Sequence, residues 1–305
     1  MTDRGAARVV VRGLGKDFGD LRAVHDVDLT LRSGTVTGLV GPNGAGKSTT
    51  IGALVALVRP TRGTVVIDSH DVVRDGARAL AGVGYLPSVF VGRAASTARR
   101  YLDDLARLRR LSLTTTIGTL AERLRLDLDQ PIGHMSHGTR QKVGVVQAFM
   151  HEPTVLLLDE PTTGLDPLVQ DQLWQMVDER RDAGAAVLLS SHVMSEVQRA
   201  ADDVAMMSDG LIVLADSMLE LTRRRSTRLE LRVLSPPLLP VLRGIPGVRH
   251  ASVSGHQVEV DMTGPTSELF TVLAPHGIES VTCHDDDLAA VFADLCGTPT
   301  EREKP

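Results

Sequence analysis

The chain has 305 residues, of which 42% are hydrophobic and 23% charged, so it is long enough for one large folded domain and a smaller one. Its formal net charge of −5 argues against a mainly electrostatic nucleic-acid binder, and we expect no nucleic-acid partner. No apolar run approaches the ~18 residues of a membrane-spanning helix, and the N-terminus lacks a secretory pattern. We therefore expect a cytoplasmic protein.

Residues 9–14 and 27–31 are rich in β-formers and alternate with a period of about two, which predicts a half-exposed antiparallel sheet. Residues 16–19 lie between these strands and include Phe18. An aromatic ring at this place could stack on an adenine, or it could fill the small sheet. The single asparagine of the chain, Asn43, rules out an Asn-Lys-x-Asp guanine-recognition element, so adenine is the expected base.

A phosphate-loop pattern, G-x-x-x-x-G-K-[ST], begins at Gly41 and follows a strand-like segment, residues 35–40. Its glycines permit backbone turns that let consecutive N–H groups converge on a phosphate at a helix start. Lys47 should reach the β- and γ-phosphates, and Ser48 should place its hydroxyl on Mg²⁺. The predicted nucleotide-binding residues of the loop are Gly41, Pro42, Asn43, Gly44, Ala45, Gly46, Lys47, Ser48 and Thr49.

The alternative, a glycine-rich turn that caps an ordinary helix, is disfavoured by the strand before the loop and the helix after it. That helix should continue through residues 51–58 and end before Pro60. Short strands are predicted at residues 65–67 and 83–86. From residue 93 to about residue 150 the pattern becomes helical.

A continuous apolar run, residues 155–158, ends in Asp159 and Glu160, as expected of a buried parallel strand that delivers acids to a sheet edge. Asp159 should hold Mg²⁺, and Glu160 should orient or deprotonate the water that attacks the γ-phosphate. A strand that ends in a solvated acidic turn is the alternative. The phosphate loop earlier in the chain favours the catalytic interpretation.

After a turn at residues 161–167, an apolar helical stripe is expected to end at Gly184, and residues 185–189 form the next predicted buried strand. His192 follows this strand, at the edge where ligands of α/β sheets bind. A lone histidine is often structural, but this position predicts contact with the γ-phosphate. Two further strands are expected at residues 204–207 and 211–215.

These residues together resemble the nucleotide-binding subunit of ATP-binding cassette (ABC) transporters over residues 8–221. The resemblance implies a P-loop NTPase (RecA-like) α/β core with an antiparallel β subdomain and a helical subdomain at about residues 93–150. It also implies ATP and Mg²⁺ as cofactors and a head-to-tail homodimer. In such a dimer Ser136 and Gly138 would contact the γ-phosphate bound by the other subunit, and Asp166 would couple the two sites. The ordered motifs that carry it are Phe18, residues 41–49, residues 136–139, residues 156–160, residues 164–166 and His192.

Two positions depart from the family pattern. The usual Leu-Ser-Gly-Gly-Gln signature is Met-Ser-His-Gly-Thr here, residues 135–139, which keeps the serine and the second glycine. We expect Thr139 in place of glutamine to alter the start of the helix. The family generally places Gln or Glu after the Gly-Tyr-Leu-Pro segment, where this chain has Ser88. Because serine is too short to span from the loop to Mg²⁺ and water, we expect slower hydrolysis or altered coupling to a partner.

The tail, residues 222–305, has the order βαββαβ followed by a last helix at residues 288–295, which suggests a ferredoxin-like accessory domain. Such a domain, the Tyr-Leu-Pro sequence and the segment at residues 287–292 resemble the bacterial branch that exports drugs, antibiotics or polysaccharides. A dimer-stabilising appendage without a ligand is the favoured role for the tail, and ligand sensing or partner contact is the alternative.

The sequence therefore predicts an ATPase subunit that dimerises on ATP, lies on the inner face of the cell membrane and drives a separate integral membrane permease. The alternatives are a soluble ABC ATPase that acts on ribosomes or DNA ends, and a regulatory nucleotide-binding module with weak turnover. Import in place of export is also compatible with the cassette, since direction belongs to the permease. The transported substrate and the identity of the permease are not encoded in these motifs.

Overall fold

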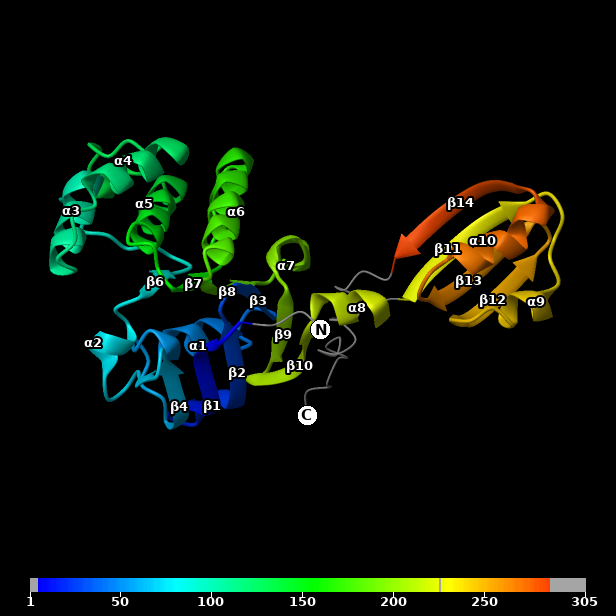
Figure 1. The fold of residues 1–305 in the computed structure, drawn as a ribbon, viewed down its shortest axis with the longest axis horizontal. Coiled ribbons are helices and arrows are strands. Elements are labelled where there is room, and N and C mark those ends of the chain that lie inside the picture. Colours follow the sequence, from blue (N-terminus) through cyan, green and yellow to red (C-terminus); the bar gives the residue numbers. More distant parts are fainter. Residues whose placement is uncertain (1–4, 225, 286–305) are drawn as a thin grey trace, which may run out of the picture. The chain divides into compact units, whose positions relative to one another are not determined.

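The computed structural model describes residues 5–224 and 226–285 of the chain. The chain divides into two compact units, Met1–Ala215 and Asp216–Pro305, whereas the boundary predicted from the sequence lay after residue 221. The predicted boundary falls inside helix α8 (Met218–Arg224). The first unit has two sheets and the second has one (Figure 1). Each unit also has its own apolar core. No helix of the described part is long and apolar enough to span a bilayer.

The first unit is built on a six-stranded sheet whose five strands from β9 to β6 are parallel. The middle strands are almost wholly buried because helices cover the sheet, which explains their continuous apolar sequences. Across the sheet the order is β10 (Leu211–Ser217), β9 (Asp203–Ser208), β3 (Thr35–Val40), β8 (Ala186–Ser191), β7 (Val155–Asp159) and β6 (Val83–Leu86).

An antiparallel sheet forms the second layer of this unit, drawn in blue in Figure 1. Its first two strands are longer than predicted because they pair along their whole length, with bulges that absorb the irregular spacing. Residues 16–18 therefore end a strand and do not form a loop. In sheet order the strands are β2 (Leu21–Arg32), β1 (Ala7–Phe18), β4 (Arg62–Ile67) and β5 (His70–Asp71).

The segment between β6 and β7 is helical, as expected for residues 93–150. Its helices are α3 (Ala98–Leu108), α4 (Thr114–Arg123), the 3₁₀ turn η1 (Ile132–His134) and α5 (His137–Phe149). The predicted helix before β8 is α6 (Pro167–Asp182). Two short helices, α2 (Gly76–Ala79) and α7 (Met194–Ala200), were not predicted. The α/β P-loop architecture with an antiparallel and a helical subdomain is thus confirmed.

Helix α1 (Lys47–Leu54) ends four residues before the predicted end, Val58. The chain leaves the helix at Ala56, whose φ of 59° lies in the left-handed region. The N–H groups of Leu57 and Val58 both donate to the carbonyl of Gly52, at 2.9 and 3.0 Å. This tight C-terminal turn, and not Pro60, ends the helix.

The second unit has a four-stranded antiparallel sheet in the order β12-β13-β11-β14 with two helices, the arrangement of a ferredoxin-like fold. Its core is apolar and includes Leu231, Val258 and Leu273. The expected last helix, residues 288–295, lies outside the described residues. The elements are β11 (Ser226–Val233), α9 (Leu239–Arg243), β12 (Val248–Ser254), β13 (Gln257–Thr263), α10 (Ser267–Leu273), the 3₁₀ turn η2 (Ala274–His276) and β14 (Ile278–Asp285).

The close packing of α5 on β6 provides a test of this fold. A Cβ atom at Gly84 would clash with the carbonyl oxygen of Ala148, so Gly84→Ala must push the helix away from the sheet. We expect a loss of about 1–3 kcal/mol in the free energy of unfolding, measured in urea. Gly76→Ala is the control, because nothing lies within 4 Å of the added atom, and it should change stability by no more than about 0.5 kcal/mol. Equal effects of the two variants would contradict this packing.

Candidate functional site

The loop between β3 and α1 has the backbone of a phosphate-binding cradle. Gly44 and Gly46 have φ values of 86° and 103°, which side chains strongly disfavour. A Cβ at Gly46 would also lie 2.6 Å from the carbonyl oxygen of Ala23. The conformation of the loop therefore favours glycine at both positions, and the close approach of β2 adds a second reason at Gly46. The loop ends at the N-terminus of α1, where free N–H groups favour an anion.

Lys47 is the first residue of α1 and is 6% exposed. Its Nζ donates to the carbonyl oxygens of Gly41 at 2.6 Å and Pro42 at 3.1 Å, and it lies 3.7 Å from Oε1 of Glu160. The ammonium group is thus held inside the loop and keeps one carboxylate beside it. This is the position from which a lysine can bind a phosphate as a point charge.

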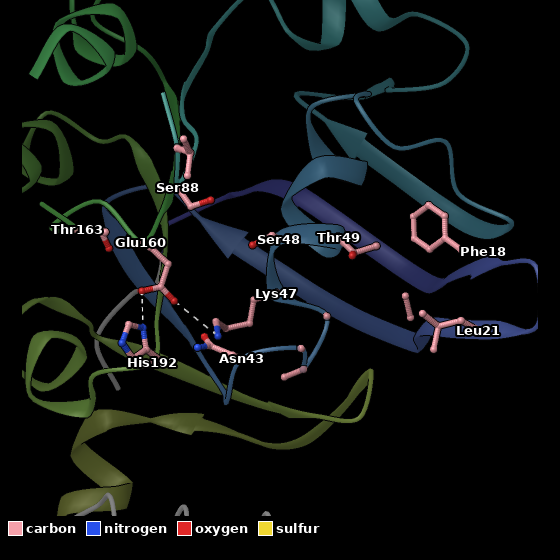
Figure 2. A pocket seen from close by; sticks show the side chains of 15 residues that line it. Phe18, Leu21, Asn43, Lys47, Ser48, Thr49, Ser88, Glu160, Thr163 and His192 are labelled. Carbon is pink, nitrogen blue, oxygen red and sulfur yellow. Dashed lines mark hydrogen bonds and ion pairs between the residues drawn. The ribbon is translucent and has the colours of Figure 1, made fainter. Parts of the chain in front are cut away.

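Glu160 follows β7 and faces the phosphate loop from the opposite side. Its φ of 49° places the backbone in the left-handed region, and this turn directs the carboxylate toward Lys47 and His192. Oε2 of Glu160 is 2.7 Å from Nδ1 of His192, which follows β8 (Figure 2). The structure therefore brings together Lys47, Glu160 and His192, three residues from distant parts of the sequence.

An open cavity of about 510 Å³ lies between these groups and the antiparallel sheet. Figure 2 shows Phe18 and Leu21 on one side of the phosphate loop, and Glu160 and His192 on the other. The space thus has an apolar end and a polar end on either side of the loop. Its lining consists of Phe18, Leu21, Ala23, Asn43, Gly44, Ala45, Gly46, Lys47, Ser48, Thr49, Ser88, Val89, Glu160, Thr163 and His192.

Leu21, Ala23, Val89 and Thr163 were not predicted as site residues, because apolar or common polar residues in strands and loops carry no sequence signal of a site. Ser88 lines the cavity at the position where the family generally has Gln or Glu. The expectation of slower hydrolysis or altered coupling from this serine stays a prediction. The structure adds that the serine faces the same cavity as Lys47 and Glu160.

Phe18 is 50% exposed, so its ring lies at the cavity and does not fill the interior of the antiparallel sheet. The Nζ atom of Lys16 lies 4.7 Å from the centroid of the ring and also donates to the carbonyl of Arg59 at 2.9 Å. A cation on one face of a ring holds it in place and leaves the other face for stacking. Adenine stacking on Phe18 remains a prediction that this geometry favours.

Asp159 ends β7 with 2% exposure and does not line the cavity surface. Its Oδ1 accepts a hydrogen bond of 2.5 Å from the hydroxyl of Ser190, a residue that the sequence did not identify as part of the site. The link depends on strand register, since Asp159 and Ser190 are directly paired across β7 and β8.

Burial, followed by the charge of Asp159, raises the pKa of Tyr85 to about 12.

The donors at this site suit Mg²⁺. Ser48 is exposed in the cavity and offers a hydroxyl oxygen, and Asp159 offers a carboxylate, both of which are the hard oxygen ligands that this ion prefers. A triphosphate supplies further oxygens when it occupies the loop. The oxygen donors present therefore fit Mg²⁺ together with a nucleoside triphosphate, and the roles of Ser48 and Asp159 as its protein ligands stay predictions.

The signature residues Ser136 and Gly138, and Asp166, do not line this cavity. Ser136 caps α5 by accepting from the N–H of Thr139 at 3.1 Å, and Asp166 caps α6 by accepting from the N–H of Val169 at 3.1 Å. That backbone hydrogen bond, helped by the charge of Lys142 3.6 Å away, lowers the pKa of Asp166.

The two caps lie close together. Gly138 lies so near the carbonyl of Gly164 that a side chain at position 138 would clash with it, and only glycine permits this approach. Ser136 and Asp166 are both exposed to solvent. The starts of α5 and α6 thus form one exposed corner of the first unit.

Comparisons with known proteins identify the family of the chain. Residues 24–163 match the family model for the ABC transporter. The ABC transporter ATP-binding protein NatA of Bacillus subtilis is 33% identical over 199 residues, which cover 63% of this chain and 81% of NatA. The chain belongs to the ABC transporter family. It is an ATP-hydrolysing member of that family.

Further relatives differ in how much of the chain they cover. The daunorubicin resistance ATP-binding protein DrrA3 of Streptomyces coeruleorubidus is 33% identical over 210 residues. The aligned region covers 67% of this chain and 66% of DrrA3. The bacitracin transport ATP-binding protein BcrA of Bacillus licheniformis is 26% identical, with 94% of this chain and 96% of BcrA covered. A solved structure of an ATP-binding subunit of an ABC transporter is 30% identical and has a TM-score of 0.67. The superposed region covers 71% of this chain and 92% of the chain in that structure.

The Lys16–Phe18 contact leads to a prediction about nucleotide affinity. In Lys16→Met the ring loses its cation, and we expect the KM for ATP to rise about two- to fivefold with little change in kcat, as follows from ~0.5–1 kcal/mol for an exposed cation–π contact. Arg22→Met is the matched control, because Arg22 pairs with Asp17 at 3.3 Å and carries the same charge nearby. A similar rise in both variants would show that only the local charge matters.

Proposed function

We propose that this chain is the ATPase subunit of a membrane exporter, that it dimerises on ATP, and that it powers transport through a separate permease. The observation that carries the proposal is the array of Lys47, Glu160 and His192 around the phosphate loop. It supplies a phosphate-binding cation, a general base and a polar group beside the γ-phosphate position. Relatives whose names refer to drug resistance or bacitracin transport support export.

In this proposal each residue of the array has a separate task. Lys47 and the loop N–H groups bind the phosphates, and His192 contacts the γ-phosphate while holding Glu160. Glu160 orients or deprotonates the attacking water. Ser48 and Asp159 would hold Mg²⁺, which would supply positive charge to neutralise the phosphate oxygens. ATP is then the expected nucleotide, with its adenine stacked on Phe18 and its phosphates in the loop.

Dimerisation is supported by the position of the signature residues. Ser136, Gly138 and Asp166 lie outside the cavity of their own chain, on an exposed corner where Leu168 is 60% exposed. A second copy placed head to tail would bring these groups to the nucleotide and complete the site. ATP would then join two copies, and hydrolysis would release them.

The Glu160 side chain provides the test of the composite site. We expect Glu160→Gln to bind ATP, to lose at least about a hundredfold in turnover because the general base is gone, and to accumulate as an ATP-dependent dimer. Gel filtration with saturating Mg-ATP measures the last effect. Glu152→Gln is the control, since the Glu152 side chain is 75% exposed at the surface and should behave as wild type. A Glu160→Gln protein that stays monomeric would contradict the proposal.

A partner surface is suggested next to the cavity. Val89 and Val91 are 59% and 83% exposed, while Phe90 between them is buried against the ring of Tyr101. These exposed valines follow Ser88, which lines the cavity, so a partner bound to them would be close to the nucleotide. We therefore place the contact with the permease here, which puts the chain on the inner face of the membrane.

Affinity purification of the tagged chain from detergent-solubilised native membranes, followed by mass spectrometry, tests the transporter role. We expect a multi-spanning membrane protein to co-purify, and Val91→Asp to reduce its recovery at least about fivefold by placing a charge on the apolar contact. Val213→Asp, at a 40% exposed position on β10, should leave recovery unchanged. Recovery with ribosomes or nucleic acid in place of a membrane protein would favour a soluble ABC ATPase.

A further inference from the structure

Ser190 is a buried serine beside the two acids of the site. It lies on β8, the strand between β3 and β7, and has no solvent exposure. It does not line the nucleotide cavity, so it has no direct contact with the space that a substrate would fill. Its hydroxyl nevertheless bonds to both acidic residues.

The hydroxyl of Ser190 has two partners of opposite kind. It donates to Oδ1 of Asp159 at 2.5 Å and accepts from the backbone N–H of Glu160 at 3.1 Å. The directions follow from chemistry, since an ionised carboxylate can only accept and an N–H can only donate. The single proton of the hydroxyl is therefore used on Asp159, and the oxygen lone pair on Glu160.

The bond to Asp159 determines how that carboxylate can bind a metal. A short hydrogen bond from a hydroxyl to a carboxylate is charge-assisted and strong, so it restricts the rotation of the Asp159 carboxylate. One carboxylate oxygen is engaged by Ser190, and the other is left for a ligand bond. Magnesium demands near-ideal octahedral geometry, so a carboxylate with a restricted orientation suits it better than a freely rotating one.

The bond to Glu160 acts on the backbone. Glu160 has a left-handed φ of 49°, and its N–H is bonded both to the carbonyl of Ser190 at 3.2 Å and to the hydroxyl of Ser190. A non-glycine residue keeps such a conformation when its surroundings hold it. In this conformation the Glu160 carboxylate reaches Lys47 and His192.

We propose that Ser190 is a positioning residue of the ATPase reaction, whose one hydroxyl orients Asp159 toward the metal and holds Glu160 in the turn that aims its carboxylate. This inference rests on the metal-ligand role proposed for Asp159 and the general-base role proposed for Glu160. It predicts that loss of the hydroxyl weakens the response to Mg²⁺ more than it weakens the binding of the nucleotide itself.

The experiment measures the affinity of the full-length chain for a fluorescent ATP analogue with Mg²⁺ and with EDTA, together with kcat as Mg²⁺ is varied. In Ser190→Ala we expect unchanged affinity in EDTA, an affinity gain from Mg²⁺ at least about fivefold smaller than in wild type, and a kcat at least about tenfold lower. Ser190→Cys keeps the shape of the side chain but has a weaker hydrogen-bond donor. Its affinity gain from Mg²⁺ and its kcat should lie between those of wild type and Ser190→Ala. It also provides the measurement if the alanine variant does not fold.

Ser191→Ala is the matched control, because Ser191 is the next residue, is equally buried, and bonds instead to Glu196 at 2.7 Å and to the N–H of Val193 at 2.9 Å. Its response to Mg²⁺ should equal that of wild type. Equal responses to Mg²⁺ in Ser190→Ala and Ser191→Ala would overturn the inference. Asp159→Asn distinguishes failure of the Ser190 inference from failure of the proposed metal role of Asp159. If this variant leaves the response to Mg²⁺ unchanged, the metal role of Asp159 is itself wrong.

Discussion

The in-register pairing of three parallel strands is the constraint on which the rest of the site depends. Strand β8 lies between β3 and β7, with Ser191 paired to Val40 and Ser190 paired to Asp159. Because parallel strands in register end at the same edge, the phosphate loop, the acidic turn and His192 must emerge side by side. Burial of β7 and β8 on both faces holds this register, since a slip would move apolar side chains out of the core.

Within that frame, the charges of the site stabilise one another. Glu160 adopts a left-handed backbone that costs about 1–2 kcal/mol for an ordinary residue. The contacts of its carboxylate with Lys47 and His192, and of its N–H with Ser190, offset this cost. Lys47 is in turn held by two carbonyls of the loop. The polar end of the cavity is therefore organised before a nucleotide arrives, which reduces the ordering that binding requires.

The signature corner, which we propose completes the site of a second subunit, is built on a different structural principle. Ser136 and Asp166 use their side chains to cap α5 and α6, and Gly138 packs directly on Gly164. The two helix starts are thereby joined, so they would move together when a second subunit approaches. The segment from Ser88 to Val91 connects the cavity to the surface on which we place the permease. A change in nucleotide state thus has a short physical route to that partner, since Ser88 and the two exposed valines lie within four residues.

The sequence by itself determined the type of each strong element and of most functional groups. Continuous apolar runs predicted the buried strands, and the glycine pattern with Lys47 and Ser48 predicted the phosphate loop, because these signals are local in the chain. The ferredoxin-like order of the second unit followed from alternating short patterns for the same reason. The predicted end of α1 was wrong because a left-handed turn at Ala56, and not the proline, ends that helix.

Tertiary structure alone decided which groups meet. The bond between Ser190 and Asp159 depends on strand register, and the closeness of Gly138 to Gly164 depends on how two helix starts pack. The contact of Lys16 with Phe18 lies at the end of β1, where the pairing with β2 shifts register. None of these pairs is near in sequence except the last, and none has a composition signal. Side chains of ordinary type acquire a role there through distance and orientation, which a one-dimensional pattern does not contain.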